Sequence, residues 1–74
     1  MTTEVRRLVA SAVISELGRT GRDSVWLAER SGLSHRDVEA SLAGGRDLTV
    51  AELAAIADAL AVSPARLVPA PPSG

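Results

Sequence analysis

The sequence has no cysteine, lysine, phenylalanine or tyrosine among its 74 residues. Without cysteine there can be no disulfide, no thiolate metal ligand and no cysteine nucleophile. Tryptophan occurs once and is the sole aromatic residue, which disfavours the core of a β-sandwich or barrel. No apolar run reaches the roughly 18 residues of a membrane-spanning helix, and the N-terminus shows no signal-peptide pattern. We therefore expect one small helical domain in the cytoplasm.

A strong net charge is also missing, because eight arginines face nine acidic residues and leave a net charge of −1. Nucleic-acid-binding proteins are usually basic, so this balance alone argues against that role. The distribution along the chain weakens the objection. Residues 1–18 are neutral, residues 19–46 have a net charge of +1, and residues 47–74 have a net charge of −2. The acidic excess thus lies outside the central segment.

Alanine, leucine and valine dominate the apolar residues, with thirteen, nine and eight copies, which favours closely packed short helices. Thr2-Thr3-Glu4 offers a cap and a first-turn acid for a first helix that ends near residue 18. The apolar residues of this segment recur at helical spacing and are Val5, Leu8, Val9, Ala12, Val13 and Leu17. The segment is expected to be an amphipathic helix.

Two further short helices are predicted in the centre of the chain. Asp23 can cap the first of them, and Gly32 is a suitable residue to end it. Ser34 begins the pattern Ser34-x-x-Asp37, so the next helix starts about three residues later and ends at Gly44-Gly45. A tight glycine-containing turn between two short helices predicts a helix-turn-helix unit.

The last third predicts a fourth and a fifth helix. Thr49-x-x-Glu52 is a capping box, and Ser63-Pro64 predicts a short helix over Pro64–Val68. The expected buried stripe of the fourth helix consists of Val50, Leu53, Ala54, Ile56, Ala57 and Leu60. We expect a domain over residues 1–68 and a flexible proline-rich tail over residues 69–74.

Many of these residues fall at fixed spacings that match a known pattern. They are Val9, Val13, Gly21, Leu27-Ala28, Gly32-Leu33-Ser34, Val38, Gly44, Leu53, Ile56, Ala57, Ala59-Leu60, Val62-Ser63 and Leu67. In these positions the chain resembles the Cro/C1-type (XRE) helix-turn-helix family of bacterial and phage repressors, without gaps from Val9 to Leu67. The resemblance implies a compact, all-α, five-helix, lambda-repressor-like DNA-binding domain with the helix-turn-helix at helices 2 and 3.

In a helix-turn-helix, the N-terminal residues of the second helix contact base edges in the major groove. The candidate base-reading residues are His35, Arg36, Glu39 and Ala40. Arg36 matches O6 and N7 of guanine, Glu39 can accept from cytosine, and Ala40 can contact a thymine methyl. Two alternatives stay open: Arg36 as a simple surface charge, and His35 with Glu39 as an intrahelical pair.

Contacts to the DNA backbone are expected from helix N-termini and flanking arginines. The candidates are Arg19, Arg22, Ser24, Ser41 and Arg46. The chain departs from the family pattern at Asp23, which places a negative charge near DNA, and at Ser24, which replaces a longer glutamine. Both departures weaken the expected clamping of the backbone. Some of the arginines have the alternative role of solubilising a loop.

Four residues are candidates for a dimer or partner surface: Val25, Trp26, Leu67 and Val68. Val25 and Trp26 stand where the family usually has polar residues, so they form either an apolar patch or, for Trp26, a stack on Arg30. The resemblance also implies dimerisation through the C-terminal end. Core packing is the alternative role for Leu67, which leaves Val68 as the better interface candidate.

No catalytic, metal or cofactor motif is found, so the sequence predicts neither an enzyme nor a bound cofactor. A lone histidine without cysteine is a poor start for a metal site. The expected function is that of a repressor-like transcriptional regulator of bacterial or phage origin, binding double-stranded operator DNA as a homodimer. The alternative is a protein-interaction module of the same fold, such as an antitoxin, an anti-repressor or a polymerase-binding adaptor.

Overall fold

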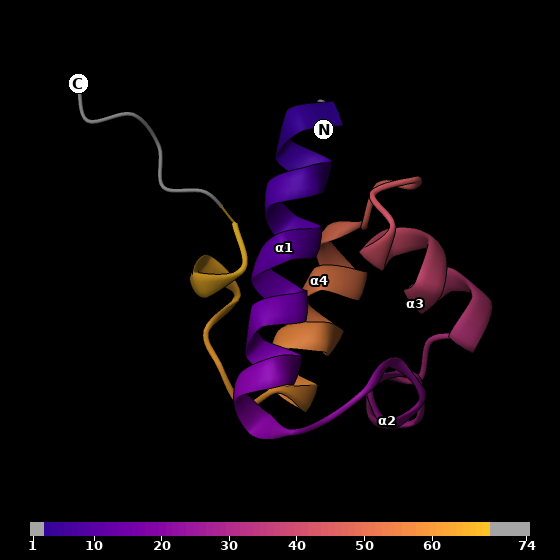
Figure 1. The fold of residues 1–74 in the computed structure, drawn as a ribbon, viewed down its shortest axis with the longest axis vertical. Helices are drawn as coiled ribbons and strands as arrows, with labels where there is room; N and C mark the ends of the chain where they lie inside the picture. The colour runs from indigo at the N-terminus through magenta and orange to yellow at the C-terminus, as the bar shows by residue number, and fades with distance from the viewer. Residues whose placement is uncertain (1–2, 69–74) are drawn as a thin grey trace.

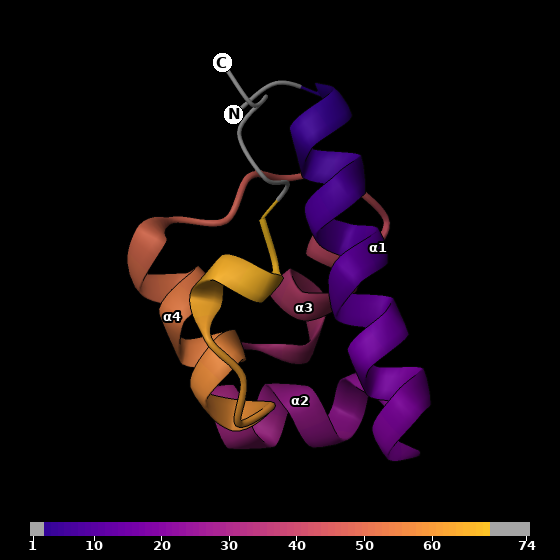
Figure 2. The same cartoon turned by 90° about the vertical axis from the view of Figure 1, so that its left-hand side faces the viewer.

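The computed structural model describes residues 3–68, and this part of the chain contains four α-helices, one 3-10 turn and no strand. The elements in chain order are α1 (Thr3–Thr20), α2 (Ser24–Ser31), α3 (His35–Leu42), α4 (Val50–Ala59) and η1 (Pro64–Arg66). Figure 1 shows α1 along the long axis of the molecule, with α2 and α3 on one side of it. Figure 2 shows α2 crossing beneath α4, with η1 in front of α4. The predicted all-α fold is confirmed.

The predicted short fifth helix is present only as a 3-10 turn over residues 64–66, so the count of five α-helices is not confirmed. Its start is as expected: the Ser63 hydroxyl accepts from the N–H of Ala65, and Pro64 occupies the first position. The chain cannot continue as an α-helix because Val68 precedes Pro69, and a residue before proline is driven out of the helical region. The predicted tail over residues 69–74 lies outside the described residues.

The caps that bound α2 and α3 follow the sequence pattern. The Asp23 carboxylate accepts from the N–H of Trp26 at 2.9 Å, and the Ser34 hydroxyl accepts from the N–H of Asp37 at 3.1 Å. Gly32 ends α2 in the left-handed conformation with a φ of 78°, where a side chain would be strained. These local signals fix the length of both helices and the three-residue turn between them.

The fourth helix begins as expected, and the first helix differs from expectation at its end. At α4 both bonds of the predicted capping box, between Thr49 and Glu52, are present. The first helix runs two residues past its predicted end, to Thr20, whose hydroxyl donates to the carbonyl of Glu16 at 2.9 Å. Gly18 lies inside α1, because one glycine lowers the stability of a helix without ending it.

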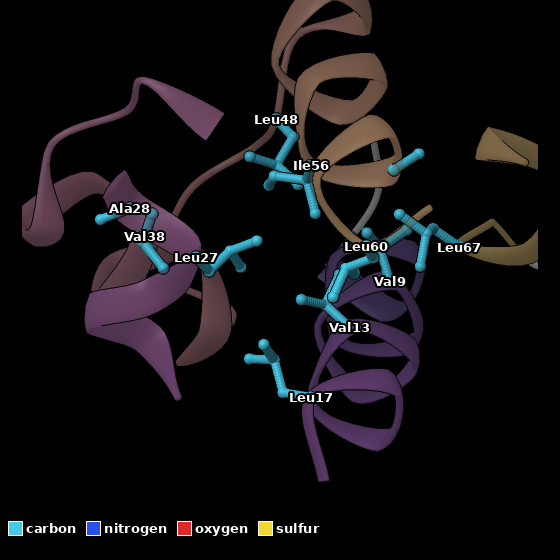
Figure 3. Packing of buried hydrophobic residues seen from close by; sticks show 11 residues of the cluster. Val9, Val13, Leu17, Leu27, Ala28, Val38, Leu48, Ile56, Leu60 and Leu67 are labelled. Atoms are coloured by element: carbon cyan, nitrogen blue, oxygen red, sulfur yellow. The ribbon is translucent and has the colours of Figure 1, made fainter. Parts of the chain in front are cut away.

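Every helix and the C-terminal turn contribute to one apolar core, seen in Figure 3. Its fully buried large side chains are Val9, Val13, Leu27, Val38, Ile56 and Leu67. Leu27 and Val38 anchor α2 and α3 from the inside, which fixes the angle between them. No helix within residues 3–68 is long and apolar enough to cross a membrane.

Three of the residues expected to be buried are exposed. Val50 is 86% exposed because it is the first residue of α4, where the side chain points back beyond the end of the helix. Leu8 and Ala54 lie on the solvent sides of their helices. Leu48, in the loop before α4, is buried and fills part of the core.

Candidate nucleic-acid interface

The turn between α2 and α3 brings the beginnings of both helices to one surface. The Ser24 hydroxyl, at the start of α2, donates to Glu39 Oε1 at 2.8 Å, although the two residues are 15 positions apart. The same hydroxyl lies 3.1 Å from His35 Nε2, and that nitrogen lies 3.1 Å from Glu39 Oε1. We call Ser24, His35 and Glu39 the polar cluster. It joins two predicted base-reading residues to one predicted backbone contact.

The polar cluster is not arranged like a nucleophilic triad, although it contains a hydroxyl, an imidazole and a carboxylate. In such a triad the carboxylate holds one ring nitrogen so that the other can take the proton of the nucleophile. Here the Ser24 hydroxyl and the Glu39 carboxylate meet the same nitrogen, Nε2 of His35. The cluster thus shows the predicted intrahelical pair with an added hydroxyl.

Arg36 is exposed on α3 beside the polar cluster, in the second position of the helix. Within residues 3–68 its side chain has no hydrogen bond, ion pair or ring contact. Four other arginines form ion pairs: Arg6 with Asp47, Arg19 and Arg66 with Glu16, and Arg46 with Glu52. The guanidinium of Arg36 is therefore ready for an external ligand. Ala40, one turn further on, is half-buried.

Arg46 and Ser41, two predicted backbone contacts, are bonded to each other. Arg46 Nη1 donates to the Ser41 hydroxyl at 3.3 Å, and Nη2 donates to Glu52 Oε2 at 3.0 Å. The Glu52 hydrogen bond raises the pKa of Arg46, while the Thr49 N–H and Arg46 lower the pKa of Glu52. Ser41 is buried. Arg46 thus holds the loop after α3 to the start of α4.

Arg19 and Arg22, the other predicted backbone contacts, also have partners. Arg19 donates twice to Glu16 Oε2, at 2.6 and 3.1 Å, and Arg66 donates to Glu16 Oε1 at 3.1 Å. These contacts, with the Arg19 hydrogen bond as the largest cause, lower the pKa of Glu16. Arg22 lies over the ring of Trp26, 5.0 Å from its centroid. The i,i+3 spacing was the available signal in the sequence for the pair of Arg19 and Glu16.

The four predicted partner residues lie in different environments. Val25 is half exposed and Val68 is 37% exposed, whereas Leu67 is fully buried in the core. Trp26 is half-buried and lies beneath Arg30 as well as Arg22, with the Arg30 guanidinium 5.9 Å from the ring centroid. The core role considered for Leu67 and the Arg30 stack considered for Trp26 are both observed.

Arg7 is a candidate contact to the DNA backbone that was not predicted from the sequence. It is exposed on α1, without a hydrogen bond or ion pair among the described residues, and its Cγ lies close to Gly44 after α3. Together with Leu42 and Ala43 it lines a shallow groove of about 220 Å³ between α1 and the end of α3. No signal in the local sequence could place α1 against this loop. Residues 3–68 contain no group of three acidic or histidine side chains fit to hold a metal.

Comparisons with known proteins complete the description of this surface. No protein-family model matches the chain, and no curated protein matches it significantly. The structure is similar to the restriction-modification controller protein C.AhdI from Aeromonas hydrophila, with a TM-score of 0.81, 22% sequence identity, and coverage of 84% of this chain and 94% of that one. At 22% identity this likeness shows that the two chains share a fold, which agrees with the all-α fold expected from the sequence.

Proposed function

We propose that the protein is a sequence-specific transcriptional regulator that places α3 in the major groove of operator DNA and acts as a homodimer. The observation that carries the proposal is Arg36, an exposed arginine without a partner among the described residues, at the capped start of α3. The likeness to a controller protein supports a regulator of this fold. Regulation follows from occupancy of the DNA site and requires no catalysed reaction. The protein would therefore act where bacterial or phage DNA lies.

Base recognition begins with Arg36, whose guanidinium pairs with O6 and N7 of guanine in a bidentate geometry. His35 lies one position before Arg36 and Glu39 lies three positions after it, but these two residues are bonded to each other and to Ser24. DNA binding exchanges these exposed bonds for bonds to a base and a phosphate, at small net cost because water already competes for them. Ala40 offers a methyl contact to thymine.

Backbone contacts are fewer than the number of arginines suggests. Ser24 at the start of α2 and Arg7 near the loop after α3 are the best placed. Arg19, Arg22 and Arg46 must first give up an intramolecular partner. Because affinity for any DNA sequence grows with the number of phosphates neutralised, we expect weak non-specific binding with a shallow salt dependence.

Such weak backbone binding makes a second copy necessary. A dimer binds two half-sites about one helical turn of DNA apart, and this doubles the number of base contacts. Val68 is the best candidate for the interface among the described residues near the C-terminal end, since it is exposed and apolar. Leu67 stabilises this end from inside the core.

The test is selection of duplexes from a random double-stranded DNA library on the purified protein. We expect enrichment of a roughly twofold-symmetric sequence containing guanine in each half, and Arg36→Ala should lose the preference at that guanine. Arg30→Gln is the matched control, because it removes one exposed arginine charge that has no ion pair among the described residues and lies on α2, away from α3. Failure to enrich any sequence at moderate salt would overturn the proposal.

A protein-interaction module of the same fold is the second candidate. The observation that favours it is the scarcity of free positive charge on the surface formed by the start of α2 and the exposed face of α3, which we call the reading surface. Glu39 is exposed there, and Asp23 lies beside Ser24. The same DNA selection separates the two functions, since a module that binds only proteins enriches no duplex.

A further inference from the structure

A second arrangement of charges lies on the exposed side of α2 and includes Arg22, just before the helix, for which the sequence also predicts a contact to the DNA backbone. Arg22 and Arg30 both lie over the indole of Trp26, at 5.0 and 5.9 Å from the ring centroid. Val25, next to the indole, is half exposed. We call Arg22, Val25, Trp26 and Arg30 the arginine–tryptophan stripe. Neither of its arginines has an ion pair within residues 3–68.

Most of the stripe lies on the side of α2 opposite to Ser24. Successive residues of a helix are about 100° apart, so Trp26 and Arg30 lie about 200° and 240° round α2 from Ser24. Ser24 is the residue that bonds to α3, and the buried Leu27 and Ala28 lie within about 60° of it. Trp26 and Arg30 therefore lie opposite to the side of α2 that bonds to α3 and packs on the core.

The contact with the ring leaves the stripe ready to bind carboxylates. A guanidinium attracted to an aromatic face still has its N–H donors in its own plane, where they match a carboxylate in a bidentate geometry. Two such groups beside an exposed apolar residue combine the side chains that contribute most to protein interfaces, namely tryptophan and arginine. We propose that the stripe binds an acidic segment of a partner protein, with carboxylates on Arg22 and Arg30 and an apolar side chain on Val25 and Trp26.

A protein segment fits better than the backbone of DNA. Glu29 is exposed on the same side of α2, between Val25 and Trp26 around the helix, and forms no ion pair among the described residues. A polyanion lying along the stripe would be repelled by Glu29, whereas a protein segment can place a donor or a positive charge opposite it. DNA phosphates also offer nothing apolar to Val25. The proposal does not depend on DNA binding.

The test is selection from a displayed random peptide library on the immobilised full chain. We expect enriched peptides to carry Asp or Glu on both sides of an apolar residue and to change the fluorescence of Trp26, the sole tryptophan. The double variant Arg22→Gln/Arg30→Gln should bind them at least about tenfold more weakly. Arg66→Gln, a matched charge control, should bind them as the unchanged protein does.

Three outcomes would overturn the assignment. The first is that no acidic motif is enriched, and the second is that the enriched peptides bind the double variant equally well. The third is that the double variant loses DNA affinity and shows a shallower salt dependence, which would make the stripe a phosphate contact. Arg22 and Arg30 are both exposed, so thermal unfolding of the double variant by circular dichroism should match that of the unchanged protein.

Discussion

Acidic side chains have different partners on the two sides of this molecule. On the supporting side, formed by α1, α4 and η1, the side chains of Glu16 and Glu52 are 10% and 18% exposed and meet arginines. On the reading side, formed by the start of α2 and the exposed face of α3, the Glu39 side chain is 54% exposed and meets an imidazole and a hydroxyl. Charge pairs shielded from water are stronger and less screened than exposed ones.

The difference indicates which interactions can be exchanged for a ligand. Glu16 joins α1 to Arg66, 50 residues away, so its bonds close the fold. Glu39 joins α3 to Ser24 on the neighbouring helix, at a position exposed to water. Bonds of the first kind keep the shape that presents Arg36, and bonds of the second kind are those that the proposed binding of DNA would replace.

The largest expected effect is on the supporting side, in Leu67→Ala. Leu67 is fully buried, so truncation should lower the free energy of unfolding by about 2–5 kcal/mol through lost burial and a cavity. Val68→Ala, the exposed neighbour, is the matched control and should change it by no more than about 0.5 kcal/mol. Urea denaturation measures both. A stable Leu67→Ala that loses only its dimer would place Leu67 in the interface instead.

The next prediction compares the two sides directly, because Arg36→Ala removes a guanidinium from the reading side and Arg46→Ala removes one from the supporting side. Arg36→Ala should weaken binding to the selected operator by about 1–3 kcal/mol and leave stability unchanged. Arg46→Ala should lower stability, because Glu52 and Ser41 lose their partner. Fluorescence anisotropy and urea denaturation separate the two effects. Equal loss of specific and non-specific binding in Arg36→Ala would contradict its role as a base reader.

Local signals were sufficient to predict most of the fold. The caps Asp23, Ser34 and Thr49 and the stop at Gly32 act within one turn of a helix, so the sequence alone predicts them. At residues 64–68 the cap and the proline predicted where the turn begins but not its type or its length. A following proline leaves room for only one 3-10 turn.

The site was less predictable, because its contacts join distant residues. Arg36 was predicted from its position at the start of α3, and the structure leaves it free of partners within residues 3–68. The bond between Ser24 and Glu39 and the place of Arg7 beside Gly44 depend on how the helices pack. Arg46 differs from Arg36 in this respect, because the sequence indicates no partner for it and the structure pairs it with Glu52.

A smaller effect is expected at the start of α4. Thr49→Ala removes the acceptor for the N–H of Glu52 and should lower the free energy of unfolding by about 1 kcal/mol, with DNA affinity unchanged. Thr49→Ser, which keeps the hydroxyl, is the matched control and should retain most of the stability. The comparison would weaken if Thr49→Ala reduced DNA affinity as much as Arg36→Ala, since the supporting side would then take part in reading.

The dependence on pH should follow the same division, since the two acids whose pKa is lowered both lie on the supporting side. The folded protein lowers the pKa of Glu16 and Glu52, so their stabilisation is present above the unfolded value of 4.5 and is lost as the pH falls through the folded values. Thermal unfolding between pH 7 and pH 2 should show this loss. The double variant Glu16→Gln/Glu52→Gln should lose less stability over the same interval, and an unchanged slope would remove these acids as its cause.

The smallest expected effect on stability is that of Glu39→Gln, which keeps the shape of the side chain and removes its charge. Because the polar cluster is exposed, the free energy of unfolding should change by no more than about 0.5 kcal/mol. Affinity for non-operator DNA should rise slightly, since one negative charge leaves the reading side. Glu16→Gln, the matched change on the supporting side, should lower stability more and leave DNA affinity unchanged. If the two variants unfolded equally easily, the bond between Ser24 and Glu39 would belong to the scaffold, and DNA could not displace it without loosening α2 from α3.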